Sequence, residues 1–340
     1  MTAAIRRVLP GDADALRQVH EVFEAVRAAE TPENAPVPAE RYAGALEHPP
    51  PNSEIRCYAA EADGKVVGLL WIYLPLKENT HYSETELAVH PAHRRRGVGT
   101  ALLDHLLQVA RDEERTEVIV SHRAQVEGGP VRPDTGARFL EGRGFTVALT
   151  EIDRSLRLDT LDPAAETRLW DESIGAADDY ELVSWIGRCP EAYVEGLGRI
   201  DSQIFAEIPL GDVDLRPRTV DADFVRTRED RAEAQGHILI RTIAVHKATG
   251  DVTANTVIYA QAGDEHAGQA ITIVDPAHRG HRLGLLAKLA NLRQLREHHG
   301  HVTTVWTGNA DTNANMVAIN DLLGFRPVDA RVSYKRNLAA

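Results

Sequence analysis

Residues 89–99 read Val-His-Pro-Ala-His-Arg-Arg-Arg-Gly-Val-Gly, and residues 274–284 read Val-Asp-Pro-Ala-His-Arg-Gly-His-Arg-Leu-Gly. Six of the eleven positions are identical: the valine, the proline, the alanine, the histidine, the first arginine and the last glycine. The dipeptide Gly144-Phe145 recurs as Gly324-Phe325 at nearly the same spacing. Two matches in the same order, about half a chain apart, indicate an internal repeat.

The length of the chain agrees with a duplicated unit. At about 100–200 residues per domain, 340 residues suggest two domains. The repeat places the boundary near Asp159-Thr-Leu-Asp-Pro163, so we predict domains at residues 1–158 and 159–340. The chain is 43% hydrophobic and 26% charged, which allows a packed core in each domain and argues against wholesale disorder.

Each half is expected to have the α+β class: a mostly antiparallel mixed sheet flanked by helices. Antiparallel strands come first, and a strand, a glycine turn, a helix and a further strand follow. In the first half, the expected strands are 5–8, 55–61, 66–74, 84–89, 117–121 and 145–158, and the helices are 13–30, 97–111 and 134–141. In the second half, the strands are 180–186, 238–246, 252–259, 270–274, 302–307 and 331–335, and the helices are 282–299 and 312–322.

Each copy of the motif places a turn between a strand and a helix. Backbone N–H groups at a helix N-terminus have no intrahelical partner and can bind an anion. Gly97 and Gly99 let the backbone approach that anion closely, and Arg94, Arg95 and Arg96 add positive charge. The turn therefore favours a phosphate or a pyrophosphate. The net charge of −13 conceals this local cationic site.

In this context the chain resembles the GCN5-related N-acetyltransferase family, called GNAT. The first half carries Val89-x-Pro91-x-x-Arg94-x-x-Gly97-x-Gly99 and the opening Ile5-Arg-x-Val-x-Pro-x-Asp12. The second half carries Val274-x-Pro276-x-x-Arg279, and later Asn309-Ala-x-x-Asn313 ahead of its Gly-Phe. The resemblance covers nearly the whole chain. It is similar to actinomycete tandem acetyltransferases such as mycothiol synthase and the acetyltransferase of clavulanic-acid clusters.

The resemblance implies that the chain binds acyl-CoA, with acetyl-CoA as the expected donor. The diphosphate would lie on the turn amides, and the pantetheine arm would pair with the strand before each turn. A backbone N–H of that strand would polarise the thioester carbonyl. The implied cofactor-binding residues are Leu87, Ala88, Val89, Arg94, Arg95, Arg96, Gly97, Val98, Gly99, Thr100, Ile273, Val274, Arg279, Gly280, His281, Arg282, Leu283, Gly284, Leu285, Asn309 and Asn313.

Three positions depart from the family pattern. Arg282 stands where the first glycine of the turn is usual, and it would either crowd the diphosphate or add a cation to it. Many members of the family have a tyrosine four residues before the late Gly-Phe, as the acid for the leaving thiolate. That position is Leu140 in the first half and Asn320 in the second. Because Asn320 can donate a hydrogen bond, these positions favour the second half as the catalytic one, although the first turn is more regular.

An amine nucleophile must lose a proton, so a general base is expected. Glu84 and Glu86 lie on the strand before the first turn and share one face of it. Thr272 and Asn255 are the second-half candidates for orienting a substrate or a water molecule. With Asn320, these four are the predicted catalytic residues. The alternative is that the glutamates are solvated strand residues and the others make ordinary polar contacts in a sheet.

Several other ligand classes are disfavoured. Cys57 and Cys189 form neither a disulfide framework nor a zinc site, and no histidine has metal-ligand spacing, so no metal is expected. The acidic net charge argues against nucleic acid. The longest apolar run, 66–76, is too short to cross a membrane, and no signal peptide is expected. We expect a cytoplasmic monomer or homodimer without a nucleic-acid or membrane partner.

The sequence thus predicts an acetyl-CoA-dependent N-acetyltransferase for a small amine metabolite, in which the amine attacks the thioester directly. One domain would be catalytic, and the other would bind CoA or be structural. A non-catalytic acyl-CoA sensor is the alternative, favoured by the missing tyrosine in both halves. A nucleotide-binding loop is disfavoured, because neither turn is followed by Lys-Ser/Thr and neither has the G-x-G-x-x-G spacing.

Overall fold

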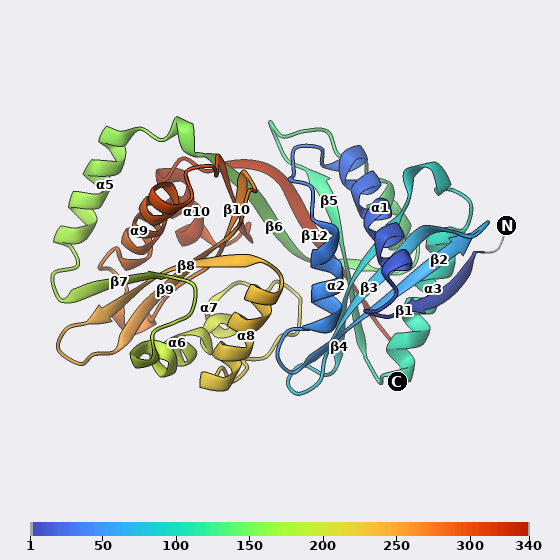
Figure 1. Ribbon diagram of the computed structural model, residues 1–340, viewed down its shortest axis with the longest axis horizontal. Helices are drawn as coiled ribbons and strands as arrows, with labels where there is room; N and C mark the ends of the chain where they lie inside the picture. Colours follow the sequence, from blue (N-terminus) through green and yellow to red (C-terminus); the bar gives the residue numbers. More distant parts are fainter. Residues whose placement is uncertain (1–2, 339–340) are drawn as a thin grey trace.

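The computed structural model describes residues 3–338. Within this range, strands and helices alternate along the chain (Figure 1). The strands are β1 (Ala4–Val8), β2 (Ser53–Ala62), β3 (Lys65–Pro75), β4 (Tyr82–Val89), β5 (Glu117–Gln125), β6 (Thr146–Arg157), β7 (Tyr180–Ile186), β8 (His237–His246), β9 (Val252–Gln261), β10 (His266–Val274), β11 (Thr304–Ala310) and β12 (Arg326–Asn337). The α-helices are α1 (Ala13–Glu30), α2 (Ala39–Glu47), α3 (Val98–Asp112), α4 (Thr135–Glu141), α5 (Pro163–Gly175), α6 (Val194–Asp201), α7 (Ile204–Glu207), α8 (Ala222–Ala234), α9 (Leu283–His298) and α10 (Ala314–Leu322).

Local chemistry sets several of these boundaries. The Asp12 carboxylate caps α1 by accepting the N–H of Ala15 at 3.1 Å. Asp63 and Gly64 join β2 to β3 with φ of +51° and +73°, as a two-residue hairpin requires. Asp221 caps α8 by accepting the N–H of Phe224 at 2.8 Å. Helix α1 and the β2–β3 hairpin agree with the elements that the sequence predicts, whereas helices α2, α5, α6, α7 and α8 were not predicted.

All the strands join one mixed sheet, in the order β1-β2-β3-β4-β5-β12-β6-β11-β10-β9-β8-β7. The last strand of the chain, β12, lies between β5 and β6, where Ser333 pairs with Ser121 on one side and with Leu149 on the other. Strand β6 in turn pairs with β11, as Ser155 does with Trp306. The two halves therefore exchange strands at the centre of the sheet, and Figure 1 shows β12 running from the second-half elements toward those of the first half.

This exchange bears on the predicted domains. The sheet continues through residue 158 from one half to the other, because β6 and β12 each contact strands of both halves. The division into 1–158 and 159–340 stays a prediction. Its outermost residues, 1–2 and 339–340, lie outside the described part of the chain.

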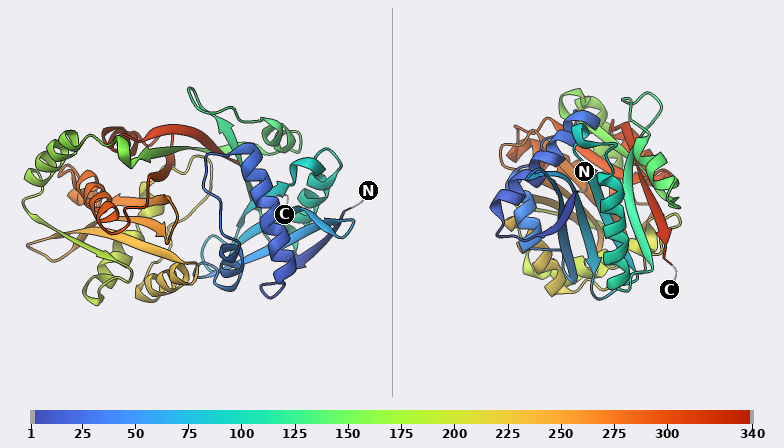
Figure 2. Two further views of the ribbon diagram at one scale, coloured as in Figure 1. Left: turned by 45° about the horizontal axis from the view of Figure 1, so that its top comes forward. Right: turned by 90° about the vertical axis from the view of Figure 1, so that its right-hand side faces the viewer.

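Helices cover both faces of the sheet in each half (Figure 2). In the first half, α3 packs on one face of β3 and β4, and α1 packs on the opposite face. In the second half, α9 covers one face of β8 and β9, and α6 and α8 cover the other. The resulting core clusters alternate along each strand, as the two-residue period of a strand requires. No helix in residues 3–338 is long and apolar enough to cross a membrane.

The sheet opens at one equivalent position in each half. Strands β4 and β5 are parallel, and their pairing ends at Thr85 and Val120. Strands β10 and β11 are also parallel, and their pairing ends at Gly268 and Trp306. Beyond these pairs, one edge of β4 and of β10 lies free of its parallel neighbour. The backbone N–H and C=O groups there can pair with a ligand instead.

Candidate functional site

The first turn, residues 94–100, presents backbone N–H groups at the start of α3. Arg95 and Gly97 have φ of +62° and +84°, and within the described chain no side chain caps this helix. The N–H of Ala101 is the first to bond back along the helix, to the Gly97 oxygen at 3.0 Å. The preceding three N–H groups therefore have no intrahelical acceptor and form an anion site.

The second turn, residues 279–285, has the same backbone form with glycine and arginine exchanged. Here Gly280 has φ of +89° and Arg282 has φ of +54°, and the Leu286 N–H bonds to the Arg282 oxygen at 3.0 Å. The Arg282 guanidinium is 2.9 Å from the Glu172 carboxylate of α5. Arginine thus occupies the left-handed position that glycine occupies in the first turn, and its charge is paired with a carboxylate.

One arginine in each half ties the turn to the preceding helices. Arg94 Nε donates to the Val89 oxygen at 3.1 Å, and its guanidinium is 2.7 Å from Glu30 at the end of α1. Arg279 forms the equivalent ion pair with Glu207 at the end of α7. These two predicted residues hold the turns in place through protein contacts.

A groove of about 590 Å³ adjoins the first turn. We call it the strand groove, because it follows the free part of β4. Arg96 does not line it, and Val98 is buried in the core instead. The predicted residues that do line it are Leu87, Ala88, Val89, Arg94, Arg95, Gly97, Gly99 and Thr100.

Eight lining residues of this groove were absent from the predicted site, among them Arg143, Phe139 and His122. Arg143 donates to Thr100 Oγ1 at 2.7 Å, and its guanidinium lies 3.9 Å from the centre of the Phe139 ring. His122 of β5 also lines the groove and lies 3.0 Å from the Pro133 oxygen. Arg143 directly precedes Gly144-Phe145, so a cation next to this dipeptide was the available signal. It places a further positive charge beside the turn amides.

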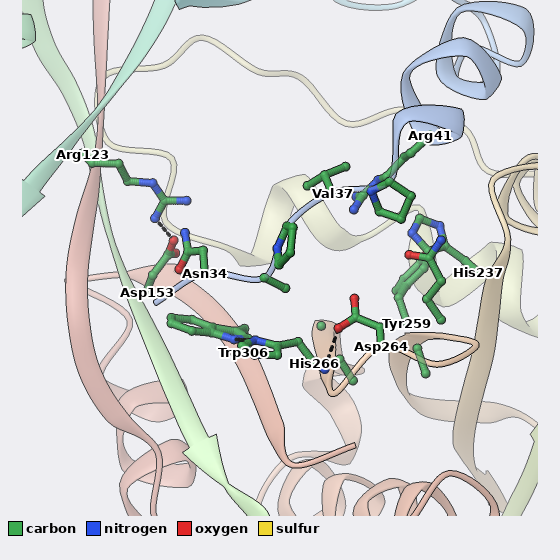
Figure 3. Close-up of a pocket in the computed structure, with 17 residues that line it drawn as sticks. Asn34, Val37, Arg41, Arg123, Asp153, His237, Tyr259, Asp264, His266 and Trp306 are labelled. Atoms are coloured by element: carbon green, nitrogen blue, oxygen red, sulfur yellow. Dashed lines mark hydrogen bonds and ion pairs between the residues drawn. The ribbon is translucent and has the colours of Figure 1, made fainter. Parts of the chain in front are cut away.

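The central cavity lies between the two halves. It has two adjoining chambers, of about 640 Å³ and 270 Å³, that share residues 37, 41, 237, 259 and 268. Its first-half walls come from α1, α2, the loop between them and strands β2 to β6. Its second-half walls come from α8 and from strands β8 to β11. Figure 3 shows the smaller chamber, with Arg41 and His237 on one side and Trp306 and Asp153 on the other.

Glu86 lines the larger chamber of the central cavity. It lies opposite Trp71 in the sheet, while its neighbour Leu87 lines the strand groove. Glu84 is the next acidic residue on the same face of β4. Both side chains reach solvent, but many protein atoms surround them, and the resulting partial desolvation raises the pKa of each carboxyl above its ordinary value. Arg331 opposes the shift in both cases.

The strand groove and the central cavity therefore meet at one strand. Residues 19–126, which contain this strand and the first turn, match the profile of the Acetyltransferase (GNAT) family. The chain contains a GNAT acetyltransferase domain. No curated protein sequence matches the chain.

Solved structures extend the GNAT likeness beyond that domain. A tandem GNAT protein from the clavulanic acid biosynthesis pathway is 28% identical, with a TM-score of 0.83 over 99% of both chains. A GCN5-related N-acetyltransferase from Sphaerobacter thermophilus is 16% identical, with a TM-score of 0.67 over 98% of this chain and 95% of that one. A putative acetyltransferase from Pyrococcus horikoshii is 14% identical, with a TM-score of 0.58 over 100% and 90%. The predicted tandem GNAT fold is confirmed, and the protein is an acyltransferase.

The position of the usual GNAT tyrosine is apolar in the first half. Leu140 is 3% exposed and packs in the core beneath α3. The equivalent Asn320 of the second half is fully buried: its Oδ1 accepts from Lys288 Nζ at 2.6 Å, and its Nδ2 donates to Asn309 Oδ1 at 3.1 Å. Arg154 donates to the same Asn309 oxygen at 3.1 Å. Asn320 is thus engaged in a buried polar network.

The other second-half catalytic candidates also have protein partners. Asn255 is 1% exposed, accepts from Arg241 at 2.8 Å and donates to Asp201 at 2.7 Å. Thr272 Oγ1 is 2.8 Å from the buried Thr256 hydroxyl. These contacts favour positioning roles within the sheet. Unlike Glu86, neither residue lines the central cavity.

The remaining predicted GNAT residues of the second half lie in the core or at helix ends. Ile273, Leu283 and Leu285 are buried. An added Cβ on Gly284 would lie 3.5 Å from both Val274 and Ile319. The ring nitrogen Nδ1 of His281 lies 3.3 Å from the Ala176 oxygen, and Asn313 caps α10 by accepting the Met316 N–H at 3.2 Å.

Proposed function

We propose that the protein transfers the acetyl group of acetyl-CoA to the primary amine of a small molecule, and that the first half carries the reaction. The observation that carries this proposal is the position of Glu86. It faces the central cavity from the strand whose next residue, Leu87, lines the strand groove. A donor in the groove and an acceptor in the cavity would meet at this strand.

The first half offers the groups that the donor needs. The free N–H groups of Val98, Gly99 and Thr100, together with Arg95 and Arg143, suit the diphosphate. The free edge of β4 beyond Thr85 suits the amides of the pantetheine arm. The thioester supplies an acyl group that an amine can attack. A backbone N–H of this strand edge would stabilise the oxyanion that develops at the carbonyl.

Glu86 is the proposed general base. A base works best when its pKa lies near the operating pH, and partial desolvation moves the pKa of Glu86 upward from its ordinary value near 4.3. The carboxylate would accept the proton of the attacking amine. Leu140 cannot protonate the leaving thiolate, and a thiol with a pKa near 8.5 can leave as the anion and take its proton from water.

This assignment replaces the preference for the second half that the sequence favoured. The position equivalent to Glu86 in β10 falls at Ala270 or Ile271, neither of which carries an acid. Asn320, Asn255 and Thr272 are engaged in contacts within the protein. The second half then serves to complete the sheet and to wall the central cavity. The tandem relative from the clavulanic acid pathway supports a role in secondary metabolism, and we propose a cytoplasmic monomer or homodimer.

The test measures thiol release from acetyl-CoA in the presence of a library of small amines. Glu86→Gln should lower kcat/KM by about 10²–10⁴-fold, the usual contribution of a general base. Glu181→Gln, on the exposed outer strand β7, is the matched control and should leave kcat/KM unchanged. Acetyl-CoA should bind all three proteins equally in calorimetry. Tight CoA binding without thiol release for any amine would contradict the proposal and favour an acyl-CoA sensor.

A further inference from the structure

The central cavity contains two arginines that come from different halves of the chain. Arg41 lies on α2 of the first half, and Arg231 lies on α8 of the second. Both line the larger chamber, together with His237 of β8. Helices α2 and α8 are in contact, and Arg231 Nε donates across this contact to the His48 oxygen at 3.0 Å. The two cations thus share one wall at the junction of the halves.

These charges have no anionic partner in the described part of the chain. Among residues 3–338, no carboxylate lies within ion-pair distance of Arg41 or Arg231, although most of the arginines there are paired. Burial lowers the pKa of Arg231, and the nearby Arg41 lowers it further. Burial and the same two arginines lower the pKa of His237 to about 4, so its imidazole is neutral at physiological pH. This wall is therefore a cationic site, half-buried at Arg231 and exposed at Arg41, without a counterion among the described residues.

The acidic group of the same chamber is Glu86. The charge of Arg41 lowers the pKa of Glu86, but the two side chains form no ion pair in the described chain. Between these polar ends, the lining is aromatic: the Tyr42 ring lies 5.7 Å from Trp71 and 4.7 Å from Phe23. The chamber thus offers a carboxylate, an apolar wall and a pair of cations to one ligand.

We propose that the acceptor is a primary amine that also carries an oxyanion, either a carboxylate or a phosphate, and that Arg41 and Arg231 bind this oxyanion. Its amino group is then directed to Glu86, and the neutral His237 ring can donate one hydrogen bond to the oxyanion. This inference rests on the proposed function, which supplies the primary amine of the acceptor. Because Arg231 and His237 belong to the second half, the acceptor site is incomplete without it. The inference thus gives the second half a role in substrate selection.

The test compares matched amines in the thiol-release assay. Phosphoethanolamine and ethanolamine form one pair, and β-alanine and 3-aminopropanol form the other, so the two pairs separate a phosphate from a carboxylate. In at least one pair, the anionic member should have a kcat/KM at least tenfold higher. Arg41→Gln and Arg231→Gln should each raise KM for that amine by about 10–100-fold, the usual effect of losing a charged hydrogen bond, with little change in kcat. Glutamine at position 231 keeps a donor for the His48 oxygen.

Arg17→Gln is the control, because Arg17 lies exposed on α1 and pairs with Asp14 and Glu21. It should leave KM unchanged. Equal rates for the anionic and neutral members of both pairs would overturn the inference while the proposed function stands. If no amine is acetylated, inorganic phosphate is titrated calorimetrically into protein saturated with CoA. Phosphate binding that both arginine variants abolish would uphold the inference although the proposed function fails, and the absence of such binding would overturn it.

Discussion

Lys288 allows a sharp test of the buried network around Asn320. Its side chain is 1% exposed on α9, and its ammonium group meets Asn320 Oδ1 at 2.6 Å, Met316 Sδ at 4.0 Å and the Phe325 ring at 5.2 Å. Burial alone lowers the pKa of Lys288 to about 7. Lys288 lies four residues after Gly284, and the equivalent first-half residue, Leu103 four residues after Gly99, is apolar and belongs to the core. We therefore expect Lys288→Met to fold and to be a nearly volume-conserving change.

The protonation of Lys288 determines how its contribution to the free energy of unfolding changes with pH. An unfolded lysine has a pKa near 10.4, so between pH 7 and pH 10.4 the unfolded chain binds more protons than the folded one. The free energy of unfolding of the native protein therefore gains up to about 1.4 kcal/mol per pH unit from Lys288 across this window. The lowered pKa of Lys288 therefore reduces the free energy of unfolding by about 4 kcal/mol at pH 7 and by about 1 kcal/mol at pH 10. Against it stands the loss of the donor to Asn320 Oδ1, which costs about 1–3 kcal/mol.

Lys288→Met should thus be more stable than the native protein by about 2 kcal/mol at pH 7, and less stable by about 1 kcal/mol at pH 10. The assay is urea unfolding of both proteins at the two pH values. Taking the difference between the proteins at each pH removes the other groups that titrate in this range, such as Cys57. A variant that is destabilised equally at both pH values would refute the reasoning, since Lys288 would then contribute through packing and not through its protonation.

Three further predictions concern the turns and the base. Gly99→Glu should abolish CoA binding to the first half, because a carboxylate would meet the diphosphate, and calorimetry should show a lower stoichiometry. Gly99→Ala should still bind CoA, since its Cβ would lie in ordinary contact with Phe139 at 3.6 Å. Arg282→Gly should raise the free energy of unfolding by up to about 1 kcal/mol. Glycine adopts a φ of +54° without steric cost, and the exposed ion pair to Glu172 that is lost contributes little. A lower urea midpoint for this variant would count against the prediction. The kcat/KM of the native enzyme should fall as the pH drops through the raised pKa of Glu86, because the base becomes protonated, and this acidic limb should be missing from the profile of Glu86→Gln.

The parts of the fold that depend on short-range chemistry could be predicted from the sequence. The turn before α3 follows from Gly97 and from the helix pattern after it, and the first turn and strand groove agree with that prediction. The β2–β3 hairpin follows from Asp63-Gly64. Helix α2 escaped prediction because prolines surround it, and α5 escaped because its C-terminal part and the residues that follow, Asp171–Asp179, carry few apolar residues. Helix α5 contacts α9, where Arg293 stacks on Trp170, and such a contact leaves no periodic pattern.

The strand exchange could not be predicted, because it is a long-range choice between two similar strands. Both β6 and β12 follow a Gly-Phe dipeptide, and each could complete the sheet of its own half. In the structure, the buried Asp329 of β12 accepts from Arg123 of β5 at 3.0 Å and from Arg132 at 2.9 Å. Each of these charges is paired across the exchange, and separating them would leave a buried carboxylate uncompensated. This pairing ties β12 to the first half in a way that local sequence patterns do not reveal.

The exchange also explains why one half can lose catalytic features and still be required. The Arg282 turn departs from the glycine pattern, and β10 lacks an acid at the position of Glu86. Yet β12 fills the centre of the first-half sheet, and Arg231 reaches the cavity that Glu86 lines. A truncation at residue 158 would remove both β12 and Arg231, while Arg41 of the cationic wall would remain. The second half is therefore expected to act on acceptor binding and stability, while the first turn and Glu86 act on the donor and on the proton.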